Sequence, residues 1–347
     1  SQFVSENWAI SLTGVMAIYP ESVLLGASQM REPYLIMLVT LGLFGMIAVS
    51  QAKGVVGVWS IALSLIGILL ISPGVAIPMI ILIGGWYALG AWKQELPIKK
   101  ILIAAGLFLG AIFIAVVILG ASWETVTTYK GGGVLGIVGE WAKRTAQYNS
   151  YLLKQSSGIV QVMMATLPKW LAFPFVAIYG LLQPVLPAVL FEPGEMFWKV
   201  IGFLRSVGWY SILPILMIFP FGLRTSPIGT RKTQWVWVYA VLVTWVLVSS
   251  LRGGGDQWDN PRYRTILLPP MLLLVGVYLN QLNALGKAWL RRIFAIEGFN
   301  LILFCHWYSW RYTGFGFDLG IRNTILIGIC GSVALLFAIR QPKSTAL

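Results

Sequence analysis

The chain has 347 residues, of which 58% are hydrophobic and only 11% are charged, and it carries a net charge of +13. About a quarter of the residues in soluble domains are charged, so this composition excludes the soluble globular class. The apolar runs continue for about twenty residues, which is the length a helix needs to cross a bilayer and about twice that of a membrane β-strand. The sequence therefore predicts an all-α, polytopic transmembrane protein.

The predicted membrane spans follow one another closely and form a single transmembrane domain over 1–347. Ten apolar spans are expected, at about 8–30, 33–51, 55–72, 74–91, 101–120, 200–222, 235–251, 265–283, 298–312 and 322–340. A further segment, 168–190, contains Pro174, Pro184 and Pro187, which kink or break a helix. The basic loops before and after it all belong to the cytoplasmic side, so it cannot cross the bilayer once. It is expected to be a re-entrant or interfacial helix pair.

The outer face in this topology carries one long loop, 121–167, and the shorter polar segments 29–33, 191–199 and 252–264. Within the long loop, Glu140–Gln155 has the pattern of an amphipathic helix at the membrane interface. About half of the 25 Lys and Arg residues fall on this face, where the positive-inside rule disfavours them. Their excess favours an anionic ligand there. Their spread over membrane loops gives no reason to expect a nucleic-acid partner.

The sequence gives little indication of a metal site or a disulfide bond. Cys305 and Cys330 both lie in apolar runs, and neither has a second cysteine nearby, so no disulfide framework or cysteine metal site is visible. His306 is the single histidine, which excludes a multi-histidine metal centre. No phosphate-binding loop, zinc-protease motif or serine-hydrolase motif is present.

The stretch "SQMREPYLIML", Ser28–Leu38, places Arg31 and Glu32 directly before a predicted span, with Pro33 in its first turn. Proline is tolerated there because its missing N–H has no helical partner, and a glutamate is favoured by the helix dipole. A capped turn with a solvated ion pair explains the pattern. The alternative is that Glu32 is a carboxylate at the outer mouth of a cavity.

The stretch "RGGGDQWDNPRYRTILLPP", Arg252–Pro270, combines three arginines, two aspartates and a glycine triplet at the start of a predicted span. Glycine lets the backbone approach a ligand closely, and arginine grips phosphate with a planar fork of donors. A charged interfacial loop with snorkelling side chains is the alternative. The candidate substrate- and phosphate-binding residues are Arg31, Arg252, Asp256, Asp259, Arg262, Tyr263, Arg264 and Lys130.

The order of these motifs resembles the GT-C glycosyltransferases, the bacterial group related to protein O-mannosyltransferases and lipid-A sugar transferases. In that group a "P…S…(R/K)EP" turn starts a transmembrane helix, as in Tyr19–Leu38, and a "G(D/N)PRYRLPLLP" motif opens a late helix, as in Trp258–Leu272. The resemblance covers most of the chain. It implies an enzyme of a bacterial-type inner membrane that takes a sugar from a polyprenyl-phosphate carrier at the extracytoplasmic face. It implies further that Glu32 is catalytic and that Arg262 and Arg264 hold the carrier's phosphate.

One motif of the family has no counterpart in the chain. The family's first acidic motif, which holds the expected catalytic aspartate, belongs to a loop upstream of Ser1. Either N-terminal spans are missing from this sequence, or the protein is a homologue without that base. The resemblance also leaves the cofactor open, because divalent metal serves some members and not others.

Three functions are compared with these sequence features. The first is the extracytoplasmic glycosyltransferase, and the second is a non-catalytic membrane subunit that serves as a scaffold for other membrane subunits. The third, a transporter of a lipid-linked anion, ranks last because few charges lie well inside the spans and no inverted repeat is visible. The expected partners are the lipid bilayer, a polyprenyl-phosphate sugar and, for the scaffold, further membrane subunits.

Overall fold

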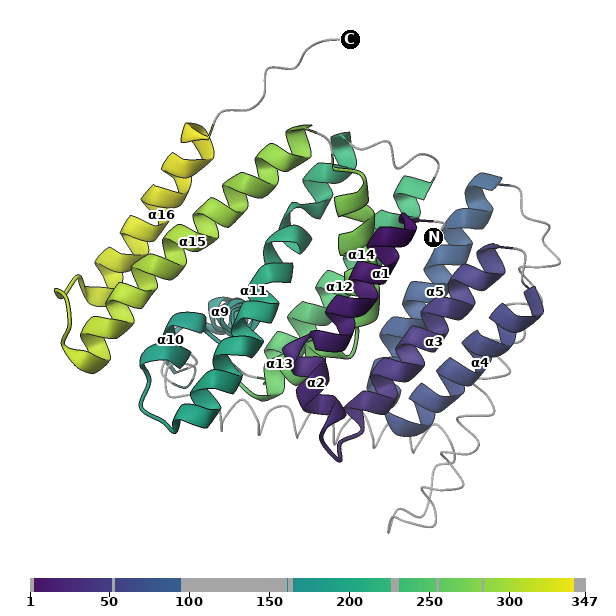
Figure 1. Cartoon of the computed structure of the whole chain (residues 1–347), viewed down its shortest axis with the longest axis horizontal. Coiled ribbons are helices and arrows are strands. Elements are labelled where there is room, and N and C mark those ends of the chain that lie inside the picture. Colours follow the sequence, from purple (N-terminus) through teal and green to yellow (C-terminus); the bar gives the residue numbers. More distant parts are fainter. Residues whose placement is uncertain are drawn as a thin grey trace. The chain divides into compact units, whose positions relative to one another are not determined.

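The computed structural model describes residues 3–51, 54–94, 161, 165–225, 231–253, 256–282 and 284–339. Every regular element in this part of the chain is a helix (Figure 1). The helices are α1 (Glu6–Ile18), α2 (Pro20–Gly26), α3 (Glu32–Ser50), α4 (Gly54–Ile71), α5 (Pro73–Gln94), α9 (Lys169–Leu181), α10 (Leu186–Phe191), α11 (Met196–Thr225), α12 (Lys232–Gly253), α13 (Asp259–Thr265), α14 (Leu268–Asn280), α15 (Ala284–Thr313) and α16 (Gly320–Ala338).

Six of these helices, α3, α4, α5, α11, α12 and α16, are long and apolar enough to cross a membrane. The number rises to as many as eight if each of two bent helix pairs, α1 with α2 and α13 with α14, is counted as one span. The all-helical membrane class is thereby confirmed, whereas the expected count of ten spans is not reached in the described residues. The expected span at 101–120 and the outer loop at 121–167, with its interfacial helix, lie outside them.

Prolines explain where several helices begin. α2 begins at Pro20 and α5 begins at Pro73, while Pro33 occupies the first turn of α3. A proline at these positions loses no hydrogen bond, because the first N–H groups of a helix have no partner within it. Pro20 also divides the expected span at 8–30, so that α1 and α2 meet at an angle of 55°.

The expected boundaries at two places are wrong. The predicted short span at 298–312 is only the second half of α15, a helix of 30 residues that also contains the basic stretch assigned to a cytoplasmic loop. Arg292 in that stretch is 6% exposed and donates hydrogen bonds to the carbonyl of Ile339 at the end of α16, so packing there favours a continuous helix. The arginine-rich stretch before residue 265 is also no simple loop, because Asp259–Thr265 form α13. The predicted break within 168–190 is confirmed by the separation of α9 from α10.

The chain divides into two compact units. The first contains Ser1–Leu24, Leu182–Gly229 and Met271–Leu347, and the second contains Leu25–Leu181 and Thr230–Pro270.

In the first unit, α15 and α16 lie side by side as an antiparallel pair (Figure 1). The amide of Asn300 donates a hydrogen bond of 2.9 Å to the hydroxyl of Ser332, and the ring of Phe299 packs against Gly331. Most apolar side chains of α16 are exposed, including Ile325 and Phe337. Such a surface is normal for a helix that faces lipid, which is as apolar as the side chains themselves.

In the second unit, α3 packs against α4, and α12 packs against both α5 and α9. The backbones of α3 and α4 approach closely where glycines face one another, at Gly45 and Gly57. The hydroxyl of Ser64 bridges the two helices by donating a hydrogen bond of 2.7 Å to the carbonyl of Leu38. Small residues and interhelical hydrogen bonds of this kind are the usual means of helix association in a membrane.

Replacing Gly45 by alanine is expected to lower the free energy of unfolding by about 1–3 kcal/mol, the usual penalty for overpacking. A Cβ atom at this position would lie 2.7 Å from the carbonyl oxygen of Gly57 and 2.9 Å from the backbone nitrogen of Ile61, and backbone atoms cannot swing aside. The matched control is Gly84→Ala in α5 of the same unit, where a Cβ meets nothing within 4 Å. Thermal unfolding in detergent, followed by tryptophan fluorescence, compares the two. A Gly45→Ala variant as stable as the control would contradict the close packing.

Candidate functional site

The site is built around Glu32, the first residue of α3. Its side chain is 0% exposed, and its Oε1 atom accepts a hydrogen bond of 2.8 Å from Nε of Arg262. Arg31, which is 45% exposed, places its Nε atom 3.7 Å from the same oxygen. The second oxygen, Oε2, is buried and has no hydrogen-bond donor among the described residues. The reading of Arg31 and Glu32 as a solvated ion pair on a capped turn is therefore wrong, because the carboxylate is buried and its close partner comes from α13.

Most buried side-chain polar atoms have a hydrogen-bond partner, because an unmet acceptor loses its hydration without compensation. Glu32 is held through one oxygen only, and the other oxygen is left to accept a proton or a hydrogen bond. The geometry therefore provides a fixed carboxylate that could accept a proton from a bound hydroxyl group.

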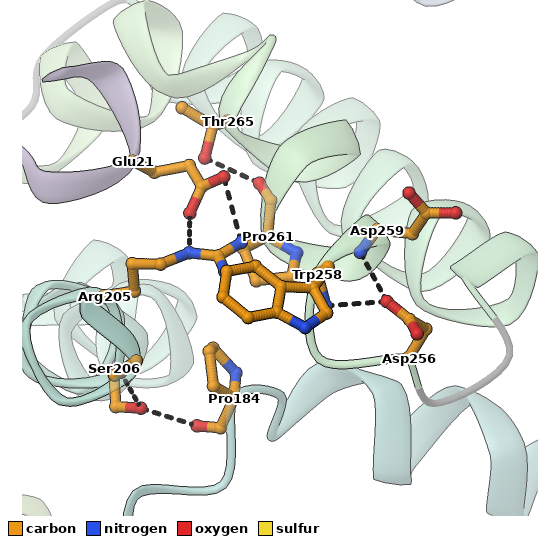
Figure 2. Close-up of polar contacts among 10 residues, drawn as sticks. Glu21, Pro184, Arg205, Ser206, Asp256, Trp258, Asp259, Pro261 and Thr265 are labelled. Carbon is orange, nitrogen blue, oxygen red and sulfur yellow. Dashed lines mark hydrogen bonds and ion pairs between the residues drawn. The ribbon is translucent and has the colours of Figure 1, made fainter. Parts of the chain in front are cut away.

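The turn before α13 is organised by Asp256. One oxygen of its carboxylate accepts hydrogen bonds from the backbone N–H groups of Trp258, at 2.6 Å, and Asp259, at 2.7 Å (Figure 2). The carbonyl of Asp256 also accepts a hydrogen bond of 2.9 Å from the side-chain amide of Asn260. Asp256, expected as a substrate-binding residue, therefore satisfies the free N–H groups at the start of a helix, as aspartates commonly do.

Replacing Asp256 by alanine is expected to lower the free energy of unfolding by about 1 kcal/mol, the typical net contribution of an intramolecular hydrogen bond. The Asp256→Asn variant keeps an oxygen that can accept the same bonds, and it should retain most of this stability. If Asp256 instead only contacted a substrate, neither change would lower the free energy of unfolding. Chemical denaturation of the three proteins in detergent distinguishes the two roles.

The three arginines of the predicted cluster have different partners. The guanidinium of Arg262 lies between two carboxylates, because its Nη1 atom is 3.6 Å from Oδ1 of Asp259 while its Nε atom binds Glu32. Arg264 is 2% exposed and donates a hydrogen bond of 3.3 Å from Nη1 to the carbonyl of Leu181, the last residue of α9. A cation at this position satisfies a carbonyl that has no partner within the helix.

Arg252, at the end of α12, packs on an aromatic ring instead. Its guanidinium carbon lies 4.3 Å from the centre of the Tyr263 ring, and that of Arg262 lies 5.4 Å from the same centre. Tyr263 is itself buried, and its backbone carbonyl accepts a hydrogen bond of 3.2 Å from the indole of Trp245. The ring thus has a fixed position, which holds Arg252 by a cation–π contact.

The charged side chains around Asp259 affect the pKa of its carboxyl group. Burial raises the pKa of the Asp259 carboxyl, and the negative charge of Asp256 raises it further. The positive charges of Arg262 and Arg252 oppose this rise. Asp259 belongs to a helix of seven residues, which is too short to cross a membrane by itself.

A second buried ion pair lies in the first unit and was not predicted. The guanidinium of Arg205, in α11, donates hydrogen bonds to both carboxylate oxygens of Glu21, in α2, including one of 3.1 Å from Nη2 to Oε1 (Figure 2). The two side chains are 3% and 2% exposed. The pairing with Glu21 accounts for the charge of Arg205 without an anionic ligand.

Of the predicted site residues, the structure brings together Glu32, Arg31, Arg262 and Asp259 through ion pairs and hydrogen bonds. Lys130 lies outside the described residues. Within the part of the chain that the structure describes, no group of three or more His, Cys, Asp or Glu side chains is arranged to hold a metal ion.

Comparison of the chain with protein families, with curated proteins and with solved structures gave no match.

Proposed function

We propose that the chain is a GT-C-type glycosyltransferase that takes a sugar from a polyprenyl-phosphate carrier. The observation that carries the proposal is the buried carboxylate of Glu32, which Arg262 holds by one oxygen while the other has no donor among the described residues. Transfer of a sugar from a phosphate to a hydroxyl group needs a base for the hydroxyl proton and positive charge near the phosphate. A carboxylate beside a group of arginines supplies both.

The chemistry assigns a role to each charge. Oε2 of Glu32 accepts the proton of the acceptor hydroxyl while the oxygen of that hydroxyl forms a bond to the anomeric carbon. The bond from that carbon to the phosphate oxygen breaks, and the phosphate leaves with the bonding electrons. The arginine cluster stabilises the negative charge that grows on the departing phosphate. A divalent metal, where one takes part, would stabilise the same charge.

The same proposal includes the finer architecture. It places about ten spans in a bacterial-type inner membrane of the cell envelope, with 168–190 as a re-entrant or interfacial segment and the site at the extracytoplasmic face. The basic loops before and after 168–190 support this orientation. The sugar acceptor is a hydroxyl group that reaches the same face.

A non-catalytic membrane subunit is the second candidate. It is favoured by the observation that Arg262 and Arg264 already contact groups of the protein, an arrangement that stabilises a fold without any ligand. In this case the buried ion pairs fix the register of the helices, and the outward apolar face of α16 meets lipid or other membrane subunits.

The two candidate functions are distinguished by measuring whether the protein consumes a sugar donor. The full chain, reconstituted in liposomes, is supplied with a panel of polyprenyl-phosphate sugars and with extracts that contain acceptors, and the release of free polyprenyl phosphate is measured. A transferase releases the carrier from at least one donor above the level of protein-free liposomes. Intact donors throughout the panel, with a folded protein, would contradict the proposal and favour the scaffold.

A further inference from the structure

We infer that Asp259 is a positioning residue that acts through Arg262, and that it becomes the counter-charge of Arg262 once Glu32 has accepted the hydroxyl proton. The inference rests on the proposed function. The motif of the resembled family has glycine at the position that Asp259 occupies in this chain, so the resemblance gives this carboxylate no role.

Arg262 lies between two carboxylates at different distances. Its Nε atom is 2.8 Å from Oε1 of Glu32, and its Nη1 atom is 3.6 Å from Oδ1 of Asp259. The first contact is a hydrogen bond, whereas the second is an ion pair that is too long for one. Asp259 and Arg262 are three residues apart on α13 and therefore neighbours on its surface, so side-chain rotation alone can shorten the second contact.

Proton transfer changes the balance of charge around Arg262. When Oε2 of Glu32 takes the proton of the acceptor hydroxyl, the electrons of the broken O–H bond stay with the hydroxyl oxygen, and Glu32 becomes neutral. Arg262, whose side chain is only 27% exposed, then loses its nearest negative charge. A mostly buried charge without a counter-charge is costly, so the step is slow unless a second carboxylate lies within reach.

Asp259 is the carboxylate that is placed for this role. It is already within ion-pair distance of Arg262, and its side chain is 28% exposed, so water screens the contact only in part. Asp256 is exposed, and one of its oxygens accepts two backbone hydrogen bonds of the turn. Asp256 thus has a local structural role, and Asp259 is left to pair with Arg262.

The neighbouring arginines increase the need for a second carboxylate. The guanidinium carbons of Arg252 and Arg262 lie 4.3 and 5.4 Å from the centre of the same Tyr263 ring, so another positive charge is close to Arg262. Arg31 also lies beside Glu32, but it is 45% exposed and water solvates its charge when Glu32 becomes neutral. Arg262 is therefore the cation that proton transfer leaves in need of a partner.

A double-mutant cycle tests the inference without a measurement of sugar transfer. Glu32→Gln keeps the shape of the side chain and fixes position 32 in the neutral state that follows proton uptake. Asp259→Asn is expected to lower the equilibrium constant for folding at least about tenfold more in the Glu32→Gln background than in wild type, because only there does it remove the last carboxylate beside Arg262. Chemical denaturation of the full chain in detergent is measured at mildly alkaline pH, because burial raises the pKa of Asp259 and its carboxylate must be ionised.

The control in this cycle is Glu195→Gln, which turns an exposed carboxylate into an amide and should have the same effect in both backgrounds. An equal effect of Asp259→Asn in the two backgrounds overturns the inference. Asp259 would then be only a favourable negative charge in the first turn of α13, since the helix dipole does not depend on residue 32. That result leaves the proposed function standing.

Turnover gives the second measurement. Asp259→Asn is expected to lower kcat about tenfold with the KM for the polyprenyl-phosphate sugar unchanged, since Asp259 acts after the donor has bound. Asp259→Glu keeps a carboxylate within reach of Arg262 and should recover most of the loss. A raised KM with an unchanged kcat overturns the inference, because Asp259 would then bind substrate. Wild-type protein that releases no carrier from any donor overturns the proposed function, and with it the role of Asp259 in transfer, whatever the cycle gives.

Discussion

Replacing Glu32 by glutamine is expected to lower the rate of sugar transfer by about 10²–10⁴-fold, the contribution of a positioned general base. Glutamine has the same shape, and its carbonyl oxygen can still accept the hydrogen bond from Nε of Arg262. It cannot accept a proton from a substrate hydroxyl. The variant should therefore fold and bind the carrier while transfer is lost, which is measured as release of polyprenyl phosphate from a fixed amount of folded protein.

The control for this prediction is Glu195→Gln, which removes an exposed carboxylate before α11. Its transfer rate should equal that of wild type. A rate for Glu32→Gln within about twofold of wild type would remove Glu32 from the mechanism. A loss of folded protein in Glu32→Gln with no loss of rate per folded molecule would mean that the carboxylate serves only to pair Arg262.

The second large effect is expected at the ion pair of Glu21 and Arg205. Removing either partner alone, by Glu21→Leu or Arg205→Met, should lower the free energy of unfolding by about 3–5 kcal/mol, because each change leaves the other charge buried without a counter-charge. The double variant should be close to wild type or more stable, since apolar side chains of similar size avoid the desolvation of both charges. Chemical denaturation of the four proteins gives the coupling between the two residues.

An exposed arginine gives the matched control for this cycle. Arg291→Met on α15 should change the free energy of unfolding by no more than about 0.5 kcal/mol, as surface substitutions usually do. Additive effects in the cycle, with the double variant the least stable of the four, would mean that the two side chains do not stabilise each other. Such a result would contradict the bidentate contact seen in the structure.

The helical membrane class was predictable because it depends on composition summed over long windows. A run of twenty apolar residues indicates a helix whatever surrounds it. The ends of helices depend on single residues and on packing. For this reason the predicted ends of some helices were wrong. Pro20 breaks an apolar run that hydropathy alone makes continuous. The contact of Arg292 with the end of α16 lies in the tertiary structure, so the sequence could not show that α15 continues through a basic stretch.

The candidate site could be predicted only in part, because its contacts join residues that are far apart in the sequence. Glu32 and Arg262 are 230 residues apart, and only the resemblance of their two motifs to one family suggested that they meet. The pairing of Glu21 with Arg205, 184 residues apart, carried no such signal. Asp256 did carry one, because an aspartate two and three residues before free N–H groups is a common turn motif. Its local capping role could have been deduced from the sequence and was missed.

The balance of charge around Glu32 has a consequence for how a ligand arrives. Four arginines, Arg31, Arg252, Arg262 and Arg264, accompany three carboxylates, those of Glu32, Asp256 and Asp259, so the cluster has a single net positive charge. Its electric field fades over a short distance, because opposite charges cancel beyond the range of individual contacts. On the proposed function, an anionic carrier lipid is therefore not attracted to this cluster from a long distance. It is expected to reach the cluster by lateral diffusion within its own leaflet, at a rate set by the abundance of the lipid rather than by electrostatic steering.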